Sequence, residues 1–451
     1  DSRMSLQDKL DRFPTAISAL TVALPPAYHF PYPPEHTNWR DEQRAWGTTA
    51  VLFNQSWHMT DLYISGPDAL RLLSDTSVNG YRGFGAGRAK QYLAVTDEGY
   101  VVGDSILFGL EDDLFSLVGF ELPMNWIQYQ AEVGGYDVTF QRDAAGWGRL
   151  GAVPKRLYRY ELEGPAAWAI LETAAGRRLD PIGFFRMGEI ELGGLRVRAL
   201  NHTMGGVPGQ ESTGLELFGP ADQREAFVER ILAAGEPHGL LQGGALAYGT
   251  ASLESGWIGG VVPAIYTSPS LRPYREWLPD TAFENVVPAT SGSFRPAEID
   301  GYYATPWDLG YGHMVRFDHD FIGREALEAA ASDPHRRKVW LSWNDDDTAG
   351  VLADAALDRF PRPRDLYAPY HQVRDAVLRD GRTIGLTHQT GYTPGLGAWT
   401  SLASIDEAEA VEGAEVEILW GDFDGGASDP YVPDHVQRPV RATVHLQSPA
   451  L

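Results

Sequence analysis

The 451-residue sequence contains no cysteine. This excludes disulfide bridges, thiolate-bound zinc, cysteine-ligated iron–sulfur clusters and a thiol nucleophile. Basic residues are also few: 37 lysines and arginines stand against 61 aspartates and glutamates, so the formal net charge is −24. Because nucleic acids and anionic membranes attract basic surfaces, we expect neither of them as a partner.

Long hydrophobic runs are absent as well. No stretch approaches the about eighteen consecutive apolar residues of a membrane-spanning helix, and the first residues lack the apolar core of a secretion signal. Together with the missing cysteines, these features predict a cytoplasmic enzyme.

Aromatic residues, in contrast, are abundant. The chain has 13 tryptophans, 20 tyrosines and 18 phenylalanines, which make up 11% of its residues. Such a content is typical of a protein core with much β-structure. It also suits a pocket that holds a flat ligand, and composition alone does not separate these two interpretations.

One local pattern occurs three times in the first half of the chain. An alternating stretch runs into Gly-Pro and then into a helical pattern at residues 60–73, 158–171 and 215–235. Glycine breaks the strand, and proline suits a first helical turn, where its missing N–H costs nothing. We expect the third helix to end at Gly235. The pattern predicts the α+β class, with helices packed on a mostly antiparallel sheet.

The C-terminal part has a different character. Residues 339–343, 415–420 and 440–446 alternate as strands do, long helical periods are scarce between them, and residues 360–364 resemble a loop. We therefore expect two parts, residues 1–334 and residues 335–451, of which the second is a small β-barrel or sandwich.

Generic catalytic signatures are missing. The sequence has no phosphate-binding P-loop, no Gly-x-Ser-x-Gly and no His-Glu-x-x-His. Gly83–Gly87 is glycine-rich, but Arg88 stands where a dinucleotide fingerprint needs its third glycine, so a turn is the simpler interpretation.

Several longer segments nevertheless occur in a characteristic order. Residues 51–59 with 66–69, 213–217, 321–327 and 390–394 resemble the glycine-cleavage T-protein (aminomethyltransferase) family. Within that family, further segments are similar to the vanillate/3-O-methylgallate and syringate O-demethylases; they are residues 38–40, 89–92, 253–258, 274–279 and 317–324. The resemblance extends from about Tyr28 to Val444.

The resemblance implies a three-domain fold around a central folate channel. Two interleaved α+β domains, within residues 1–334, would hold folate and substrate, and a β-barrel, residues 335–451, would follow. The implied methyl acceptor is tetrahydrofolate, which leaves as 5-methyltetrahydrofolate. The implied partners are this cofactor and a small aromatic substrate, and no metal is expected.

Removing a methyl group from an aryl ether is a displacement at carbon in which a phenolate leaves. A positioned acid that protonates the leaving oxygen contributes about 10²–10⁴ in rate. The resemblance implies that Tyr248 is this acid, and an ordinary tyrosine pKa of about 10 would match a phenol product. It also implies that His58 belongs to the site, where it would polarise Tyr248 or bind a substrate hydroxyl.

Three residues match folate-side positions of the family. Glu216 corresponds to the acid that grips the pterin, and it alternates with Leu215 and Leu217, so it should face away from them. Gln55 is implied to hydrogen-bond pterin or substrate. Trp257 is implied to stack beside the folate.

The expected substrate contacts are Tyr28, Phe30, Trp57 and Phe120. Phe120 aligns with the arginine that binds the aromatic carboxylate in the vanillate enzyme, and Phe30 aligns with a pocket tyrosine. Because an unpaired carboxylate is costly in an apolar pocket, we expect a neutral methoxyphenol or a bulkier methoxyarene. Alternatively, Lys90, Arg82 or His29 supplies the positive charge from another direction.

Two other functions stay open at this point. One is folate-dependent transfer from an N-methyl amine or a sulfonium compound, because aromatic residues also form cation cages. Gly103-Asp104 argues against the aminomethyl substrate itself, since the T-protein has paired aspartates there. The other is folate binding without methyl transfer, although the branch with that role carries a cysteine motif that is absent here.

Overall fold

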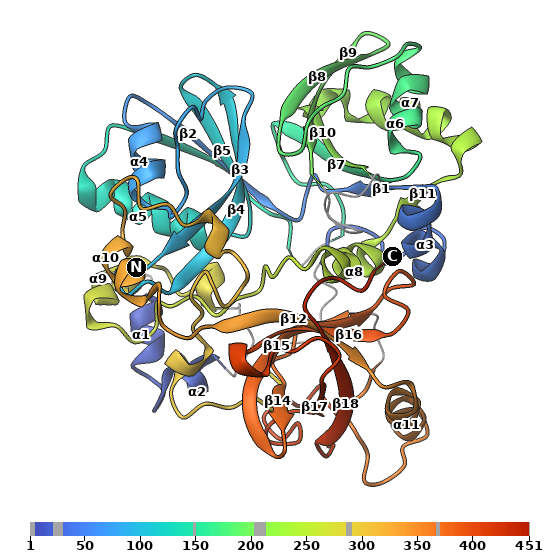
Figure 1. Cartoon of the computed structure of the whole chain (residues 1–451). Helices are drawn as coiled ribbons and strands as arrows, with labels where there is room; N and C mark the ends of the chain where they lie inside the picture. The colour runs from blue at the N-terminus through green and yellow to red at the C-terminus, as the bar shows by residue number, and fades with distance from the viewer. Residues whose placement is uncertain are drawn as a thin grey trace.

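The computed structural model describes residues 5–20, 30–147, 150–202, 213–285, 291–366 and 370–450. Three β-sheets form three lobes, and Figure 1 shows the helix α8 (Ala245–Ser255) running between the upper-right and lower lobes. Among the strand pairs of the described residues, β1–β11 is parallel and the others are antiparallel. The predicted α+β class with a mostly antiparallel sheet is confirmed.

The first lobe contains a five-stranded sheet in the order β3-β4-β5-β2-β6. Its buried residues form one core with the neighbouring helices, which include α4 (Ala69–Asp75), α5 (Leu122–Gly134) and α9 (Arg272–Trp277). The strands are β2 (Thr60–Ser65), β3 (Ala89–Val95), β4 (Val101–Glu111), β5 (Leu114–Gly119) and β6 (Thr139–Asp143), and the short helices α1 (Leu6–Leu10), α2 (Ala16–Leu20) and α10 (Arg324–Ala330) lie in the same lobe.

The second lobe contains a six-stranded sheet in the order β11-β1-β7-β10-β9-β8. Helices α6 (Ala167–Ala175) and α7 (Arg224–Gly235) cover one face, where Leu162, Leu215 and Leu217 are buried. The residues that alternate with these leucines, such as Glu161 and Glu216, therefore lie on the opposite face of the sheet. The strands are β1 (Ala50–Asn54), β7 (Leu157–Gly164), β8 (Met187–Leu192), β9 (Leu195–Asn201), β10 (Thr213–Pro220) and β11 (Leu240–Gly243).

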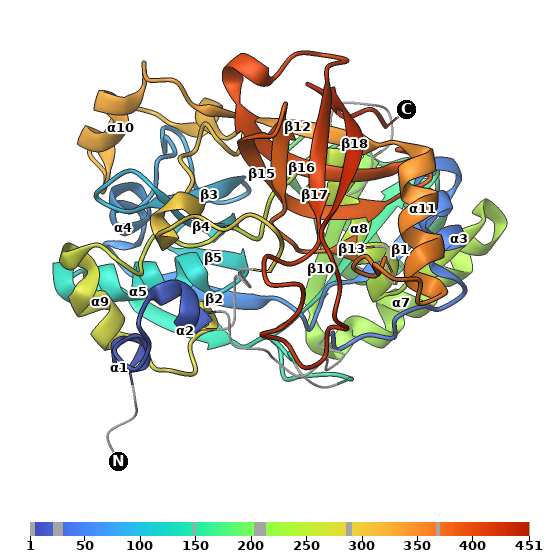
Figure 2. The ribbon, with the colours of Figure 1, turned by 90° about the horizontal axis from the view of Figure 1, so that it is seen from below.

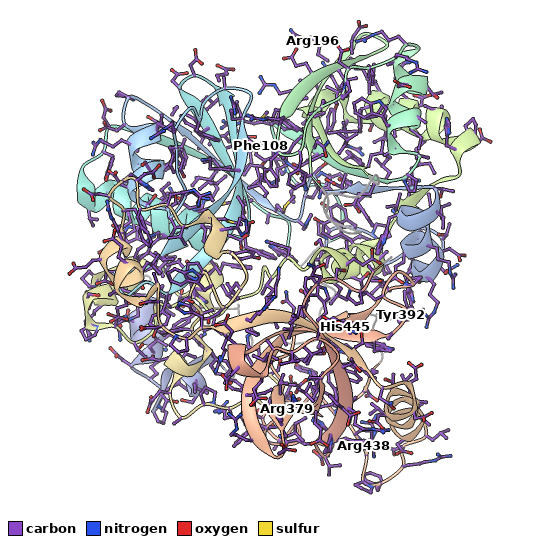
Figure 3. All side chains as sticks on the ribbon, viewed as in Figure 1. Phe108, Arg196, Arg379, Tyr392, Arg438 and His445 are labelled. Carbon is purple, nitrogen blue, oxygen red and sulfur yellow. The ribbon has the colours of Figure 1, made fainter. Side chains whose placement is uncertain are left out.

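The first two lobes meet through aromatic side chains. Phe108 of β4, labelled in Figure 3, lies edge-on to Phe218 of β10 with the ring centres 5.4 Å apart. The Arg159 guanidinium of β7 lies 4.9 Å from both ring centres. These contacts join the first sheet to the face of the second sheet that α6 and α7 leave uncovered.

The repeated Gly-Pro pattern corresponds to a tight turn between strand and helix. Gly66 and Gly164 have φ angles of 124° and 128°, and a Cβ at either position would lie 2.6 Å or 2.5 Å from a backbone carbonyl oxygen. Only glycine fits such a turn. The helix after the third Gly-Pro, α7, ends at Gly235 as predicted.

The third lobe is a closed β-barrel. Strands β15-β14-β17-β18-β12-β16 are hydrogen-bonded in this order, and β15 also pairs with β16, so the ring has no open edge. This confirms the predicted C-terminal β-barrel. The strands are β12 (Arg336–Trp343), β14 (Ala376–Arg379), β15 (Arg382–Tyr392), β16 (Trp399–Asp406), β17 (Glu415–Trp420) and β18 (Arg438–His445), with the short β13 (Tyr370–His371) beside β15.

The barrel carries one helix that its alternating pattern did not predict. Helix α11 (Asp345–Ala356) follows β12 and lies on the outside of the barrel (Figure 2). Asn344 caps its first turn, and Arg438 of β18 holds Asp354 at 2.7 Å. Strand β12 begins close to residue 335, where the domain boundary was placed; the boundary itself stays a prediction.

Helices α3 (Trp39–Thr48) and α8 join the second lobe to the barrel. Glu254 of α8 is buried and accepts hydrogen bonds from Trp46 of α3 at 3.0 Å and from Thr393 after β15 at 2.5 Å. The N-terminal end of α8 is held by Glu42 of α3, which accepts the Gly244 N–H at 2.8 Å. Helix α8 is therefore fixed at both ends.

In the described part of the chain, no helix combines the length and apolar character needed to cross a membrane.

Candidate active site

Tyr248 and His58, which are 190 positions apart in sequence, lie in direct contact. His58 sits in the turn between β1 and β2, Tyr248 lies on α8, and the distance from His58 Nε2 to the Tyr248 hydroxyl oxygen is 3.1 Å. Gln55 Nε2 also donates to that oxygen, at 3.2 Å. The structure thus brings together three of the predicted site residues.

Tyr32, which the sequence did not single out, holds the far side of His58. Its hydroxyl oxygen accepts the backbone N–H groups of Trp57 at 2.7 Å and of His58 at 3.1 Å. It also lies 2.9 Å from His58 Nδ1. Since two N–H donors occupy the oxygen's two lone pairs, Tyr32 donates its own hydrogen to Nδ1.

This arrangement defines the proton on His58. Burial, followed by the positive charge of Lys155, lowers the pKa of His58 to about 3, so the ring is neutral. Because Nδ1 accepts from Tyr32, the single ring proton is on Nε2. His58 therefore donates to Tyr248, as Gln55 does.

Tyr248 consequently accepts two hydrogen bonds, one from His58 and one from Gln55. Burial raises the pKa of Tyr248 well above 10, and the negative charge of Glu216 acts in the same direction. The ordinary pKa assumed from the sequence is therefore wrong. The residue stays protonated at neutral pH, and two donors are in place to stabilise its oxygen when the proton leaves.

A row of aromatic rings starts beside His58. Phe30 lies 5.8 Å from the His58 ring, Trp147 lies 5.2 Å from Phe30, and Phe120 stacks between Trp147 at 6.4 Å and Phe283 at 5.5 Å, measured between ring centres. Phe30 and Phe120 thus belong to one apolar surface. Trp147 and Phe283 were not predicted from the sequence.

Of the two other predicted substrate contacts, Trp57 alone lies in the described part of the chain. The Trp57 ring stacks on the Tyr32 ring with the ring centres 5.6 Å apart. The guanidinium of Arg224 lies over the Trp57 ring, 5.4 Å from its centre. Tyr28 lies outside the described residues, as does His29. The Lys90 ammonium lies 4.4 Å from the Tyr81 ring centre and 4.8 Å from the Phe84 ring centre, and it donates a hydrogen bond to the Gly80 carbonyl.

Glu216 is buried in an ion-pair network. One of its oxygens accepts a hydrogen bond from Arg159 and the other from His202 Nε2 at 2.8 Å. Burial opposes ionisation, but Arg159 and His202 outweigh it and lower the pKa of Glu216 to about 2. Arg159 also pairs with Asp61 at 3.0 Å. Glu216 is therefore an ionised carboxylate with two of its four lone-pair positions in use.

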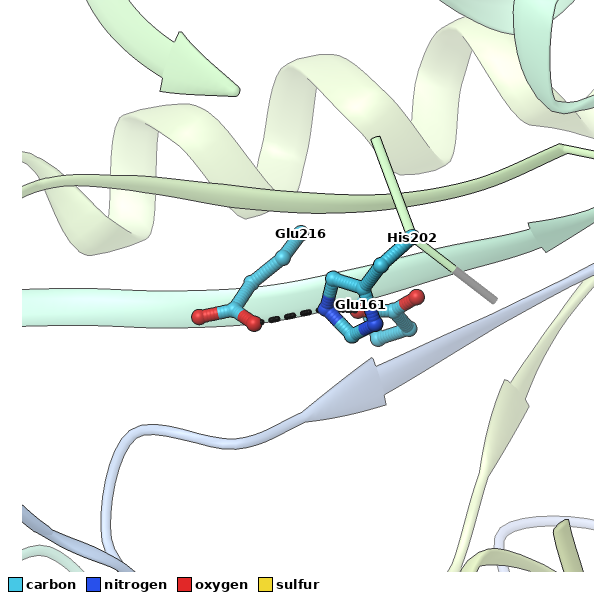
Figure 4. A group of neighbouring side chains, drawn as sticks. All are labelled: Glu161, His202 and Glu216. Atoms are coloured by element: carbon cyan, nitrogen blue, oxygen red, sulfur yellow. Dashed lines mark hydrogen bonds and ion pairs between the residues drawn. The ribbon is translucent and has the colours of Figure 1, made fainter. Parts of the chain in front are cut away.

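Glu161 of β7 lies next to Glu216. One carboxyl oxygen of Glu161, one of Glu216 and a ring nitrogen of His202 lie within 4.8 Å of one another (Figure 4). This donor set is of a kind that binds metals, but the adjacent Arg159 already neutralises Glu216 and would repel a cation. The expectation that the protein uses no metal stays a prediction.

Trp257 follows the C-terminal end of α8 and is oriented by Asp104. Its indole N–H donates to Asp104 Oδ2 at 2.8 Å, and Gln91 donates to the same oxygen at 2.7 Å. Burial raises the pKa of Asp104 to about 6, although both hydrogen bonds oppose this shift. The predicted folate-side residues Gln55, Glu216 and Trp257 are thus each held by defined partners.

One signal in the sequence would have found Arg159 and Glu161. Residues 158–163 alternate two tyrosines and a leucine with Arg159, Glu161 and Glu163. All three charged residues are buried, so both faces of this strand are covered. No comparable signal marked Tyr32, Trp147 or Phe283, which come from loops and a short 3₁₀ turn.

Comparison with solved structures identifies the fold. The chain superimposes on the glycine cleavage system aminomethyltransferase T from Bartonella henselae with a TM-score of 0.60, covering 91% of this chain and 89% of that one at 16% sequence identity. The three-domain fold is therefore that of a glycine-cleavage T-protein.

Sequence comparison identifies the family. The GCVT N-terminal domain model matches residues 16–259. The chain is 41% identical to the syringate O-demethylase of a Sphingobium species over 98% of this chain and 95% of that protein. It is 29% identical to the sesamin methylene transferase of a Sinomonas species, over 86% and 83% of the two chains. The chain is an enzyme of the aminomethyltransferase family.

Proposed function

We propose that this enzyme transfers the methyl group of a methoxyarene to tetrahydrofolate, giving a phenol and 5-methyltetrahydrofolate. The observation that carries the proposal is the Tyr248 hydroxyl, whose oxygen lies 3.1 Å from His58 Nε2 and 3.2 Å from Gln55 Nε2, two groups that can stabilise it when it gives up its proton. The similarity to a syringate O-demethylase supports the same reaction.

When bound, tetrahydrofolate supplies the nitrogen that receives the methyl group. Tyr248 donates its proton to the ether oxygen as the bond from oxygen to the methyl carbon breaks, so a phenol leaves instead of a phenolate. The Nε2–H of His58 and the side-chain N–H of Gln55 then stabilise the tyrosinate. Because the site is buried, these two hydrogen bonds act at low dielectric, where they are strongest. Tyr248 would regain its proton from the hydrogen that the cofactor nitrogen loses in exchange for the methyl group, so the proton balances over the reaction.

The folate side of the site fits a reduced pterin. Glu216 is an ionised acceptor, the Trp257 ring is oriented by Asp104, and the buried carboxyl group of Glu161 receives no N–H hydrogen bond from the described residues. A buried polar group without a partner is costly unless a ligand satisfies it. These residues would hold the pterin in line with the methyl group.

The substrate preference follows from the aromatic row. Phe120 lies between two other aromatic rings, and Lys90 is engaged at Gly80. A carboxylate placed against Phe120 would lose its hydration without gaining a partner there. We therefore propose that a neutral methoxyarene is preferred over its carboxylated analogue.

The test is a panel of paired substrates with tetrahydrofolate, following 5-methyltetrahydrofolate. Guaiacol is compared with vanillate, and 2,6-dimethoxyphenol with syringate. We expect product from the neutral member of each pair at higher kcat/KM. Efficient turnover of the acids would refute the preference, and turnover of N-methyl amines or sulfonium compounds instead of methoxyarenes would refute O-demethylation.

A variant tests the role of Tyr248. Tyr248→Phe removes the acid, so we expect kcat to fall by about 10²–10⁴ while tetrahydrofolate affinity is unchanged. Tyr302→Phe is the matched control, because Tyr302 is also buried but donates to the Phe294 carbonyl in another part of the chain. Wild-type kcat in Tyr248→Phe would contradict the proposed reaction.

A further inference from the structure

Glu161 is a buried carboxyl group in an unusual position. It lies on β7 directly opposite Glu216 of β10 on one side and Phe53 of β1 on the other. Its exposed fraction is 0%. The groups next to its carboxyl oxygens are the acid Glu163 and His202 Nε2 at 3.4 Å, and no N–H group of the described residues donates to it. The Phe53 ring in turn packs edge-on to Tyr248 at 5.3 Å. Glu161 therefore lies on the sheet face that carries the candidate folate contacts.

The surroundings of Glu161 do not support a negative charge. Arg159 is shared between Asp61 and Glu216, and His202 Nε2 lies 3.4 Å from Glu161 but only 2.8 Å from Glu216. An ionised carboxylate without a partner is strongly disfavoured in a buried site. Burial first, and then the charges of Glu163 and Glu216, raise the pKa of Glu161. Glu161 is consequently a neutral carboxylic acid at pH 7.

The two neighbouring acids thus present different hydrogen-bonding patterns. The ionised Glu216 offers acceptors only, whereas a neutral Glu161 offers one donor and one acceptor. A reduced pterin also carries two separate pairs of adjacent groups: its amine beside one ring N–H, which are both donors, and, on the other side of the amine, a second ring N–H beside an unprotonated ring nitrogen, which are a donor and an acceptor.

We propose that Glu161 is a second pterin-binding residue, which contacts a donor–acceptor pair of the pterin as a neutral acid while Glu216 accepts from the donor pair. This inference rests on the proposed use of tetrahydrofolate. The inference accounts for the buried carboxyl group of Glu161, because the bound pterin would supply the hydrogen bonds that the protein does not. It also assigns different protonation states to two adjacent glutamates.

Calorimetric titration with tetrahydrofolate tests the inference. Glutamine reproduces one donor and one acceptor, so we expect Glu161→Gln to bind within about threefold of wild type. Glu161→Leu loses both hydrogen bonds, and Glu216→Gln loses the ionised acceptor, so each should weaken binding by about 10- to 100-fold. Asp375→Asn, which alters a fully buried acid in the barrel, is the matched control and should bind as wild type does.

The outcomes separate the two proposals. If wild type does not bind tetrahydrofolate, the proposed function fails. If wild type binds and Glu161→Leu binds equally well, only the role of Glu161 is refuted. If Glu161→Gln binds as weakly as Glu161→Leu, the neutral acid is refuted.

A second measurement does not depend on the stability of the leucine variant. Titrations of wild type and Glu161→Gln in buffers of different ionisation enthalpy give the number of protons exchanged on binding. We expect the same number for both proteins, because a neutral Glu161 exchanges none. Release of one additional proton by wild type would show that Glu161 ionises and would overturn the inference.

Discussion

At the scale of single residues, the chemistry depends on which atom carries each proton. Tyr32 accepts two backbone N–H groups and therefore donates to His58 Nδ1, which places the His58 proton on Nε2. That proton then points to Tyr248. Tyr32 does not have to touch the substrate to influence the acid; it is a positioning residue.

The first prediction concerns Tyr32→Phe. Without the Tyr32 hydroxyl, His58 can carry its proton on Nδ1, and Nε2 would then compete for the Tyr248 hydrogen. We expect kcat to fall about tenfold or more, as for a partly disabled acid, with unchanged tetrahydrofolate affinity. The ¹⁵N chemical shifts of His58 report the tautomer, and unchanged shifts with a normal kcat would show that Tyr32 is only structural.

The second prediction concerns Phe120→Arg. A guanidinium among Phe30, Trp147 and Phe283 would pair with a substrate carboxylate, and a hydrogen bond between charged groups contributes about 1.5–3 kcal/mol. We expect the ratio of kcat/KM for vanillate to that for guaiacol to rise about 10- to 100-fold. Phe120→Leu is the control without charge. If the vanillate-to-guaiacol ratio is the same in Phe120→Arg and Phe120→Leu, the carboxylate of vanillate does not bind next to residue 120.

At the scale of elements, the position of Tyr248 depends on how α8 is anchored. Glu42 of α3 is fully buried, and its two oxygens accept the N–H groups of His36, Thr37 and Gly244 at 2.7, 2.8 and 2.8 Å. Gly244 immediately precedes α8. Glu42 thereby ties the start of α8 to the loop that follows Tyr32.

The third prediction concerns Glu42→Ala. Three N–H groups would lose their acceptor, and each buried unsatisfied group costs about 1–3 kcal/mol. We expect the free energy of unfolding to fall by roughly 3 kcal/mol or more and kcat to fall because α8 shifts. Denaturant unfolding measures the first effect. Asp41→Ala, on the exposed face of α3, is the control; equal stability of the two variants would contradict the anchoring role.

At the scale of the whole molecule, buried acids make stability depend on pH. Burial is the main cause that raises the pKa of Asp375 to about 7 and of Glu284 to about 7. A raised pKa means that the folded state favours the protonated acid. The associated stability is present below the ordinary pKa near 4 and is lost as the pH rises through about 7.

The fourth prediction concerns Asp375→Asn, because asparagine cannot ionise. Relative to wild type, the variant should gain stability between pH 4 and pH 8, on the order of 1–3 kcal/mol. Urea unfolding at pH 4.5 and pH 8 measures the difference. An identical difference between the two proteins at both pH values would show that Asp375 does not titrate in this range.

Much of the local structure was determined by the sequence itself. The Gly-Pro turns, the strand at residues 60–65 and the end of α7 at Gly235 follow from residue types within a few positions of each other. The ordered motifs indicated the family, and with it the T-protein fold. Tyr248, His58 and Gln55 were named from those motifs, and their contact is a property of the fold.

Only the tertiary structure decided how these residues are held and charged. Tyr32 and Trp147 reach the site from loops, and the adjacency of Glu161 and Glu216 depends on the register between β7 and β10. The pKa of His58 and of Tyr248 depends on burial by distant segments. Alternation in a sequence records that two faces differ, but it does not record that both faces are covered, because burial is a property of the assembled chain.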